Sequence, residues 1–295
     1  MVVKKSIGDI LFDILNTVFL VLLTLITLYP FVHVIAGSIS GPGALIGHKG
    51  ALLWPKGTPT LAAFGLVFRN PNILTGYKNT LIVLVLGTAV NIIMTSLGAY
   101  VTSRKQFAAR RVMMFMIIFT MYFGGGMIPR YLFLKNYLGM GDHLGSLILP
   151  GAVSAYNMII MRTAFASIPE SLEESARMDG ANDFVILFRI IIPLSAATVA
   201  VMILFYGVSH WNAWFDAMIF LRTRANYPLQ LILREILVDD STESMTMGMS
   251  NDDVELLTDN LKYATIIIAT LPILCVYPFI QKHFVKGVMI GAVKG

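Results

Sequence analysis

Residues 173–193 read EESARMDGANDFVILFRIIIP, a charged stretch between two long apolar runs that is broken by Gly180 and closed by Pro193. The residues just before it, Ile168-Pro169-Glu170-Ser171, are typical of a helix start, because proline suits the first turn and acids suit the positive end of the helix dipole. Gly180 can end that helix in a left-handed conformation, and Asp183 can cap a second one. The stretch therefore predicts a short helix-turn-helix.

The composition around this stretch is that of a membrane protein. Hydrophobic residues make up 56% of the 295, charged residues only 13%, and the mean hydropathy is +0.74. Soluble domains carry about a quarter charged residues, so a bilayer is needed to take up this much apolar surface. The lone Cys275 excludes a disulfide framework. The net charge of +5 comes from basic residues at the ends of apolar runs, which does not indicate nucleic-acid binding.

Six apolar runs are long enough to cross a membrane, which predicts an all-α integral membrane protein with a single transmembrane domain over 1–295. The first run exceeds the apolar core of a signal peptide, so we expect it to be retained. The predicted spans are 11–36, 79–102, 112–133, 144–166, 190–221 and 262–281.

The distribution of Lys and Arg predicts the orientation. An even number of spans places both termini on one side, and 12 of the 22 basic residues fall on that side, in the shorter connections. Since cytoplasmic loops carry the excess of positive charge, we expect both termini in the cytoplasm. The helix-turn-helix then lies on the cytoplasmic surface, and Pro193 marks the point where the chain enters the membrane.

The spacing within the quoted stretch resembles the "EAA" loop of binding-protein-dependent ABC importers. The family pattern is E-A-A, three residues, G, nine residues and I-x-L-P. Here Glu174-Ser175-Ala176 is followed three residues later by Gly180, and nine residues after that by Ile190-Ile191-Ile192-Pro193. Ser175 and Ile192 depart from the pattern, but both substitutions are small or isosteric.

Further motifs extend the resemblance over nearly the whole chain to the carbohydrate permeases of the maltose type. They are RMDGA after the acids, NMIIMRTAFASIPESL at 157–172, WNAWFDAMIFL at 211–221 and the terminal GAVKG. The chain most resembles the second permease subunit of oligosaccharide importers, such as the alginate importer. The resemblance implies a type I ABC importer permease fold in the inner membrane of a bacterial cell.

The resemblance also implies partners: a second permease, two ATPase subunits that dock on the EAA loops, and an extracytoplasmic solute-binding protein that delivers the sugar. It implies an EAA coupling loop over 169–193, in which the candidate coupling residues are Glu173, Glu174, Ser175, Ala176, Asp179, Gly180, Ala181 and Pro193.

The chain itself lacks the sequence of a nucleotide site. No Gly-Lys-Ser/Thr occurs, so the phosphate-binding P-loop is missing and the ATPase, with its ATP and Mg²⁺, is expected on separate subunits. The five histidines show no metal-ligand spacing, and we expect neither a catalytic role nor a bound cofactor.

The fifth predicted span is the richest in polar and aromatic side chains. Rings that stack on a sugar face beside groups that pair with its hydroxyls suit a sugar path, whereas an aromatic belt at the outer interface is the alternative. The candidate pathway residues are Tyr206, His210, Trp211, Asn212, Trp214 and Asp216, with Asn157 of the fourth span. Asn157, like Asn91, is equally suited to hold helices together.

Two other questions stay open at the level of sequence. The segment from Glu235 to Asp259 holds eight acids and no Lys or Arg, and is either a solvated loop or a docking surface. An ion-gradient-driven secondary transporter is the alternative function, although it would require intramembrane acids beyond Asp216 and the end-lying Asp13. A membrane-embedded enzyme would require a metal or nucleophile constellation that the sequence does not contain.

Overall fold

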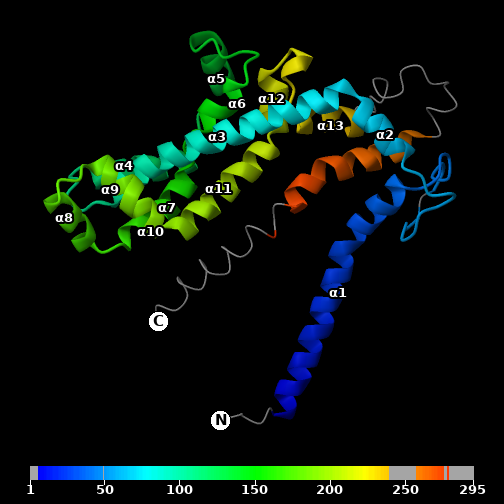
Figure 1. Cartoon of the computed structure of the whole chain (residues 1–295), viewed down its shortest axis with the longest axis horizontal. Coiled ribbons are helices and arrows are strands. Elements are labelled where there is room, and N and C mark those ends of the chain that lie inside the picture. Colours follow the sequence, from blue (N-terminus) through cyan, green and yellow to red (C-terminus); the bar gives the residue numbers. More distant parts are fainter. Residues whose placement is uncertain (1–5, 49, 239–256, 276–277, 279–295) are drawn as a thin grey trace. The chain divides into compact units, whose positions relative to one another are not determined.

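The computed structural model describes residues 6–48, 50–238, 257–275 and 278, and all regular structure within these ranges is helical. The chain divides into two compact units, Met1–Asn70 with Ile236–Thr270, and Pro71–Glu235 with Leu271–Gly295. Figure 1 labels the helices, whose bounds are α1 Ile7–Ser38, α2 Ala62–Arg69, α3 Pro71–Ser103, α4 Arg110–Tyr122, α5 Met127–Leu132, η1 Phe133–Tyr137, α6 Gly145–Ile148, η2 Leu149–Gly151, α7 Ala155–Ala166, α8 Glu170–Met178, α9 Asp183–Ile186, η3 Leu187–Ile191, α10 Ile192–Leu194, α11 Ala196–Trp211, α12 Trp214–Phe220, η4 Arg224–Asn226 and α13 Leu229–Val238. A further helix covers 257–275.

Among the described residues, two helices are individually long and apolar enough to cross a membrane, α1 and α3. They contain the predicted spans 11–36 and 79–102. Three bent helix pairs meet the same criterion jointly and correspond to the predicted spans 112–133, 144–166 and 190–221. The sixth predicted span, 262–281, is described only in part, and most of the acidic segment and the terminal GAVKG lie outside the described residues.

Bends interrupt three of the predicted spans. Arg110–Tyr122 and Met127–Tyr137 meet at 110°, across a glycine run in which Gly126 has φ +82°. A right-handed helix cannot continue through that conformation, which glycine adopts at no steric cost. Asp183–Leu194 and Ala196–Trp211 meet at 89°. The bend follows Pro193, which has no N–H to donate to the preceding turn, and this turn is π-helical over Leu187–Ile191.

In the first unit, the end of α1 is joined to the helix over 257–275. The side-chain amide of Asn260 donates to the carbonyl oxygens of Gly37 and Ser40, both at 2.9 Å. A Cβ at Gly37 would lie 2.5 Å from the ring of Tyr263, so only glycine allows this approach. The earlier turns of α1 expose their apolar side chains, as suits a helix in lipid or against another subunit.

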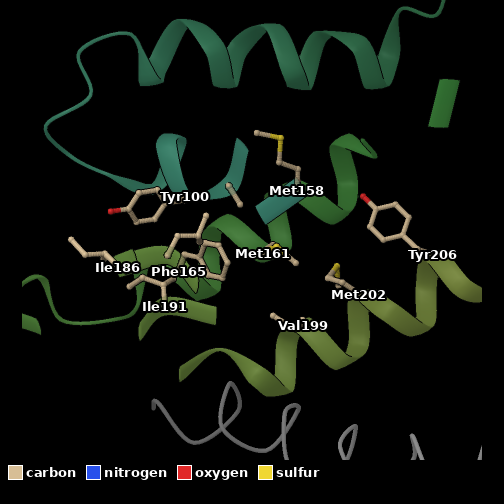
Figure 2. Packing of buried hydrophobic residues seen from close by; sticks show 11 residues of the cluster. Tyr100, Met158, Met161, Phe165, Ile186, Ile191, Val199, Met202 and Tyr206 are labelled. Atoms are coloured by element: carbon tan, nitrogen blue, oxygen red, sulfur yellow. The ribbon is translucent and has the colours of Figure 1, made fainter. Parts of the chain in front are cut away.

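The second unit is built on α3, with α7 and α11 running beside it (Figure 1). Its main core joins these helices to the helix-turn-helix segment (Figure 2). Phe165 and Met161 of α7, Met202 of α11 and Ile191 of η3 are fully buried in it. The segment that follows the quoted acids is therefore fixed by the same core that holds the long helices.

Candidate functional site

The first helix of the quoted stretch is α8, Glu170–Met178. Pro169 precedes it as the N-cap residue, and Glu170 and Glu173 place acids in its first turn, where the helix dipole favours negative charge. A helix does start within the predicted stretch 168–171, but Pro169 lies one position before it and not in its first turn.

The end of α8 is fixed by its hydrogen bonds and by one glycine. The amide of Ala181 donates to Ala176 O at 2.9 Å, and that of Gly180 donates to Arg177 O at 3.0 Å. With Gly180 at φ +85°, this is a Schellman motif, which satisfies the carbonyl groups at the helix end. The prediction that Gly180 ends the helix is confirmed. A Cβ added at Gly180 would meet no atom within 4 Å, so glycine is favoured here by its positive φ and not by lack of space.

The cap of the second helix differs from the prediction. The sequence points to Asp183, but Asn182 is the N-cap, and its side-chain oxygen accepts from the amide of Val185 at 2.9 Å. Asn182 has the extended backbone that a cap requires, and Asp183 is the first helical residue. Asp183 instead forms an ion pair with Arg177 and accepts a hydrogen bond from the hydroxyl of Tyr100 at 3.2 Å.

Two ion pairs attach α8 to the segment that follows α3. Arg104 pairs with Glu173, with side chains only 13% and 8% exposed, and Lys105 Nζ lies 3.0 Å from Glu170 Oε1 at the surface. Arg104 also stacks over the ring of Tyr100, 4.8 Å from its centroid. Burial raises the pKa of the Glu173 carboxyl, and the neighbouring Arg104 and Arg177 oppose that rise. The helix-turn-helix is thus held on the end of α3 by charge as well as by packing.

A cavity of about 370 Å³ lies beside this network. Arg104, Glu173, Glu174 and Phe184 are among its lining residues. The candidate coupling residues separate here by exposure. Glu173 is buried against Arg104, Ala176 and Ala181 are half-buried, and the exposed members are Glu174, Ser175, Asp179, Gly180 and Pro193. The two adjacent acids therefore have different surroundings.

Four of the candidate pathway residues are buried between helices. Tyr206 shares a hydrogen bond of 2.7 Å with Thr95 of α3, and its hydroxyl accepts from the amide of Ser154 at 3.1 Å. His210 Nε2 lies 2.6 Å from the side-chain oxygen of Asn91. The other buried members are Trp211, whose ring meets Tyr77 edge-on, and Asn157.

The remaining candidates are accessible. Asn212 is exposed and its amide donates to Val208 O at 2.9 Å. Trp214 is 39% exposed, with Arg234 5.7 Å above its ring. Asp216 forms an ion pair with Arg130, in which Nη2 lies 2.8 Å from Oδ2. The structure thus separates the seven candidates into helix-joining and accessible residues.

Sequence reasoning missed Arg130 and the structural role of Arg104. Arg130 lies inside the predicted span 112–133, where an unpaired charge is costly, and that cost is a signal for a partner. Arg104 belongs to a basic cluster that served only to assign topology. Its pairing with Glu173 depends on how the chain folds back after α7, which local sequence does not reveal.

Comparison with known proteins identifies the family. Residues 94–290 match the family described as binding-protein-dependent transport system inner membrane component. The chain is 41% identical over 285 residues to the polygalacturonan/rhamnogalacturonan transport system permease protein YtcP of Bacillus subtilis (strain 168), covering 97% of this chain and 99% of that protein. It is 40% identical over 285 residues to Protein LplC of the same organism, covering 96% and 95%.

A solved structure is also similar. A chain of a bacterial ABC transporter involved in the import of the acidic polysaccharide alginate superposes with a TM-score of 0.86 and 35% identity, covering 95% of this chain and 99% of that one. This likeness confirms the all-helical type I importer permease fold. Nothing supports the ion-gradient alternative. Permease subunits of such importers catalyse no reaction and bind no cofactor, because the ATPase is a separate subunit. The chain is a permease subunit of an ABC importer and belongs to the family of binding-protein-dependent transport system inner membrane components.

Proposed function

We propose that this chain forms, with a second homologous permease, the membrane path of an importer for acidic oligosaccharides. A solute-binding protein delivers the sugar, and two ATPase subunits supply energy by hydrolysing ATP with Mg²⁺. Two of the similar proteins support this substrate class. The permease YtcP is named for polygalacturonan and rhamnogalacturonan, and the solved transporter is involved in the import of alginate. Alginate and polygalacturonan are both chains of uronic acids, so their shared feature is a carboxylate on each sugar.

The proposed topology is one permease domain over 1–295 with six spans and both termini in the cytoplasm. It rests on the apolar runs and on the distribution of basic residues. A reporter fused after Lys294 should then be cytoplasmic, and one inserted at Asp240 should be extracytoplasmic. If both reporters fell on one side, the six-span arrangement would be wrong, because the pair flanks the last predicted span.

Coupling to the ATPase is assigned to the helix-turn-helix of α8 and α9. The observation that carries this assignment is the exposure of Glu174 on a helix that ion pairs and a Schellman turn hold rigidly in place. An exposed acid on a fixed helix can form a charge-assisted hydrogen bond to a basic group of a partner. Glu173, Ala176 and Ala181 shape this module, and the residues that meet the ATPase are Glu174, Ser175, Asp179, Gly180 and Pro193.

The decisive experiment compares Glu174→Ala with Ser171→Ala, which alters an exposed residue of the same helix outside the motif. Each variant is purified from membranes with its partner subunits, and ATPase stoichiometry, sugar-stimulated hydrolysis and vesicle uptake are measured. We expect Glu174→Ala to insert normally but to lose ATPase subunits or to hydrolyse ATP without uptake. Wild-type stoichiometry and uptake in Glu174→Ala would refute the assignment.

The sugar path is assigned to the accessible residues at the end of the fifth predicted span, Asn212, Trp214 and Asp216. Tyr206, His210, Trp211 and Asn157 support that path by holding α3, α7 and α11 together. Their burial and their hydrogen bonds favour this division of roles.

A further inference from the structure

Arg130 of α5 and Asp216 of α12 both line a cavity of about 230 Å³ and are in direct contact with each other. The contact is bidentate: Nη2 of Arg130 lies 2.8 Å from Oδ2 of Asp216, and Nη1 lies 3.3 Å from Oδ1. This is the geometry in which a planar guanidinium binds any carboxylate. The two residues come from distant parts of the chain, so the fold brings them together at this cavity.

The pair remains open to exchange. The side chains of Arg130 and Asp216 are 45% and 32% exposed, whereas those of Arg104 and Glu173 are 13% and 8% exposed. In a water-filled sugar path, an ion pair this accessible contributes little net stability, because water and other ions compete for both partners. A second carboxylate could therefore replace Asp216 on the guanidinium without unfolding the segment.

The cavity also has the surfaces that a sugar acid requires. Its walls include the rings of Tyr131, Phe215 and Phe220, and the rings of Tyr131 and Phe220 lie 5.6 Å apart. Aromatic rings offer flat apolar faces to the C–H groups of a sugar. Lys135, 3.0 Å from the hydroxyl of Tyr131, adds a second positive charge next to the cavity. A sugar with a carboxylate thus meets both apolar and positively charged groups.

We propose that Arg130 is a binding residue for the carboxylate of an acidic sugar and that Asp216 is its internal competitor. The uronate carboxylate takes the place of Asp216 on the guanidinium, and the sugar ring lies against the aromatic wall. A neutral sugar cannot displace Asp216, so the pair selects for acidic substrates. This inference rests on the proposed function and assigns a specific chemistry to one part of the path.

The test measures equilibrium binding to the purified permease–ATPase complex without the solute-binding protein. The probes are trigalacturonate and the neutral trisaccharide obtained by reducing its carboxyl groups. Wild-type complex should bind trigalacturonate more tightly. Arg130→Gln should weaken trigalacturonate binding roughly tenfold or more, as expected for loss of a charged hydrogen-bonded pair, and leave the neutral sugar unchanged. Arg111→Gln removes a positive charge from α4, away from the cavity lining, and should change neither.

Asp216→Asn separates this proposal from a purely structural ion pair. If Asp216 competes with the ligand, its removal should tighten trigalacturonate binding, whereas a structural pair predicts that both variants lose binding and thermal stability alike. Equal weakening toward both sugars in Arg130→Gln, or no binding of trigalacturonate to the wild type, would overturn the inference. Those results would leave the importer function intact, provided that the complex retains its ATPase subunits and imports oligosaccharide.

Discussion

Arg104, directly after α3, forms a buried ion pair with Glu173 of α8, and this contact fixes the helix that precedes the Gly180 turn. Its neighbour Glu174 is exposed. Two adjacent acids of one motif therefore have different surroundings, which fits the proposal that Glu173 holds the helix and Glu174 meets the ATPase.

This difference in burial predicts unequal effects of two alanine substitutions on stability. Glu173→Ala leaves Arg104, whose side chain is only 13% exposed, without its carboxylate partner and should lower the free energy of unfolding by roughly 3–5 kcal/mol. Glu174→Ala alters an exposed side chain and should stay within about 0.5 kcal/mol of the wild type. Thermal unfolding in detergent measures both. Equal destabilisation by the two substitutions would contradict the assigned roles.

The raised pKa of Glu173 predicts a specific pH dependence. Because the folded chain holds the carboxyl proton more tightly than the unfolded chain, the free energy of unfolding should fall as pH rises from the ordinary carboxyl pKa through the raised value. Glu173→Gln cannot ionise and should lack this decrease. Arg104→Gln removes a charge that lowers the pKa of Glu173. In that variant, the fall in the free energy of unfolding should therefore extend to higher pH. Melting curves across the acidic range compare the three proteins, and parallel pH profiles would exclude this explanation.

The positive φ of Gly180 predicts which replacements the turn accepts. Gly180→Val places a β-branched side chain in the left-handed region and should cost on the order of 1–2 kcal/mol. Asparagine tolerates this conformation, so Gly180→Asn should retain most of the stability. Since a Cβ would meet no atom within 4 Å, the two variants differ in backbone preference and not in steric contact. ATPase copurification should follow the same order. If both variants lost the ATPase subunits, any side chain at position 180 would interfere with docking, whatever its backbone preference.

Much of this arrangement could be predicted from the sequence. The apolar runs predicted a helical membrane protein, and local turn chemistry around Gly180 predicted the helix-turn-helix. The importer permease fold was implied by the resemblance of the spacing from Glu174 to Pro193 to the EAA loop. The division between buried and exposed candidates could not be predicted. It depends on which residues of α3 face His210 and Tyr206. The sequence of a hydrophobic helix without a clear polar face does not indicate which side of the helix packs against its neighbours. The bends at Gly126 and Pro193 accord with glycine and proline as helix breakers, but residue type does not determine the bend angles.

The contact between α3 and α11 predicts a contrast between two glycines. A Cβ at Gly87 would lie 2.5 Å from Nε2 of His210, whereas a Cβ at Gly207 would lie 3.7 Å from the nearest atom, in Leu84. Gly87→Ala should therefore displace His210 from Asn91 and destabilise the protein by about 1–3 kcal/mol. Gly207→Ala makes only ordinary contacts and should be neutral or stabilising by up to about 1 kcal/mol.

Thermal stability of both variants in detergent tests this contrast, with Gly87→Ala combined with Asn91→Leu as the further control. If the cost comes from the broken His210–Asn91 contact, the double variant should be destabilised by less than the sum of the two single changes. Strict additivity would mean that Gly87 acts independently of that contact.

The last prediction distinguishes the two tryptophans of the fifth predicted span. Trp211 is 5% exposed and packs edge-on against Tyr77, so Trp211→Ala should cost about 3–5 kcal/mol of stability. Its buried Nε1 donates no hydrogen bond within the described residues, so Trp211→Phe removes that unsatisfied donor and should be tolerated better. Trp214 is 39% exposed, and Trp214→Ala should reduce oligosaccharide uptake through a loss of roughly 1–3 kcal/mol of ring stacking while stability changes little. Trp54→Ala, at an 83% exposed tryptophan of the first unit, is the matched control and should change neither. Uptake in vesicles and thermal unfolding are measured on all four variants. Unchanged uptake in Trp214→Ala would assign that ring to the membrane interface and not to the sugar path.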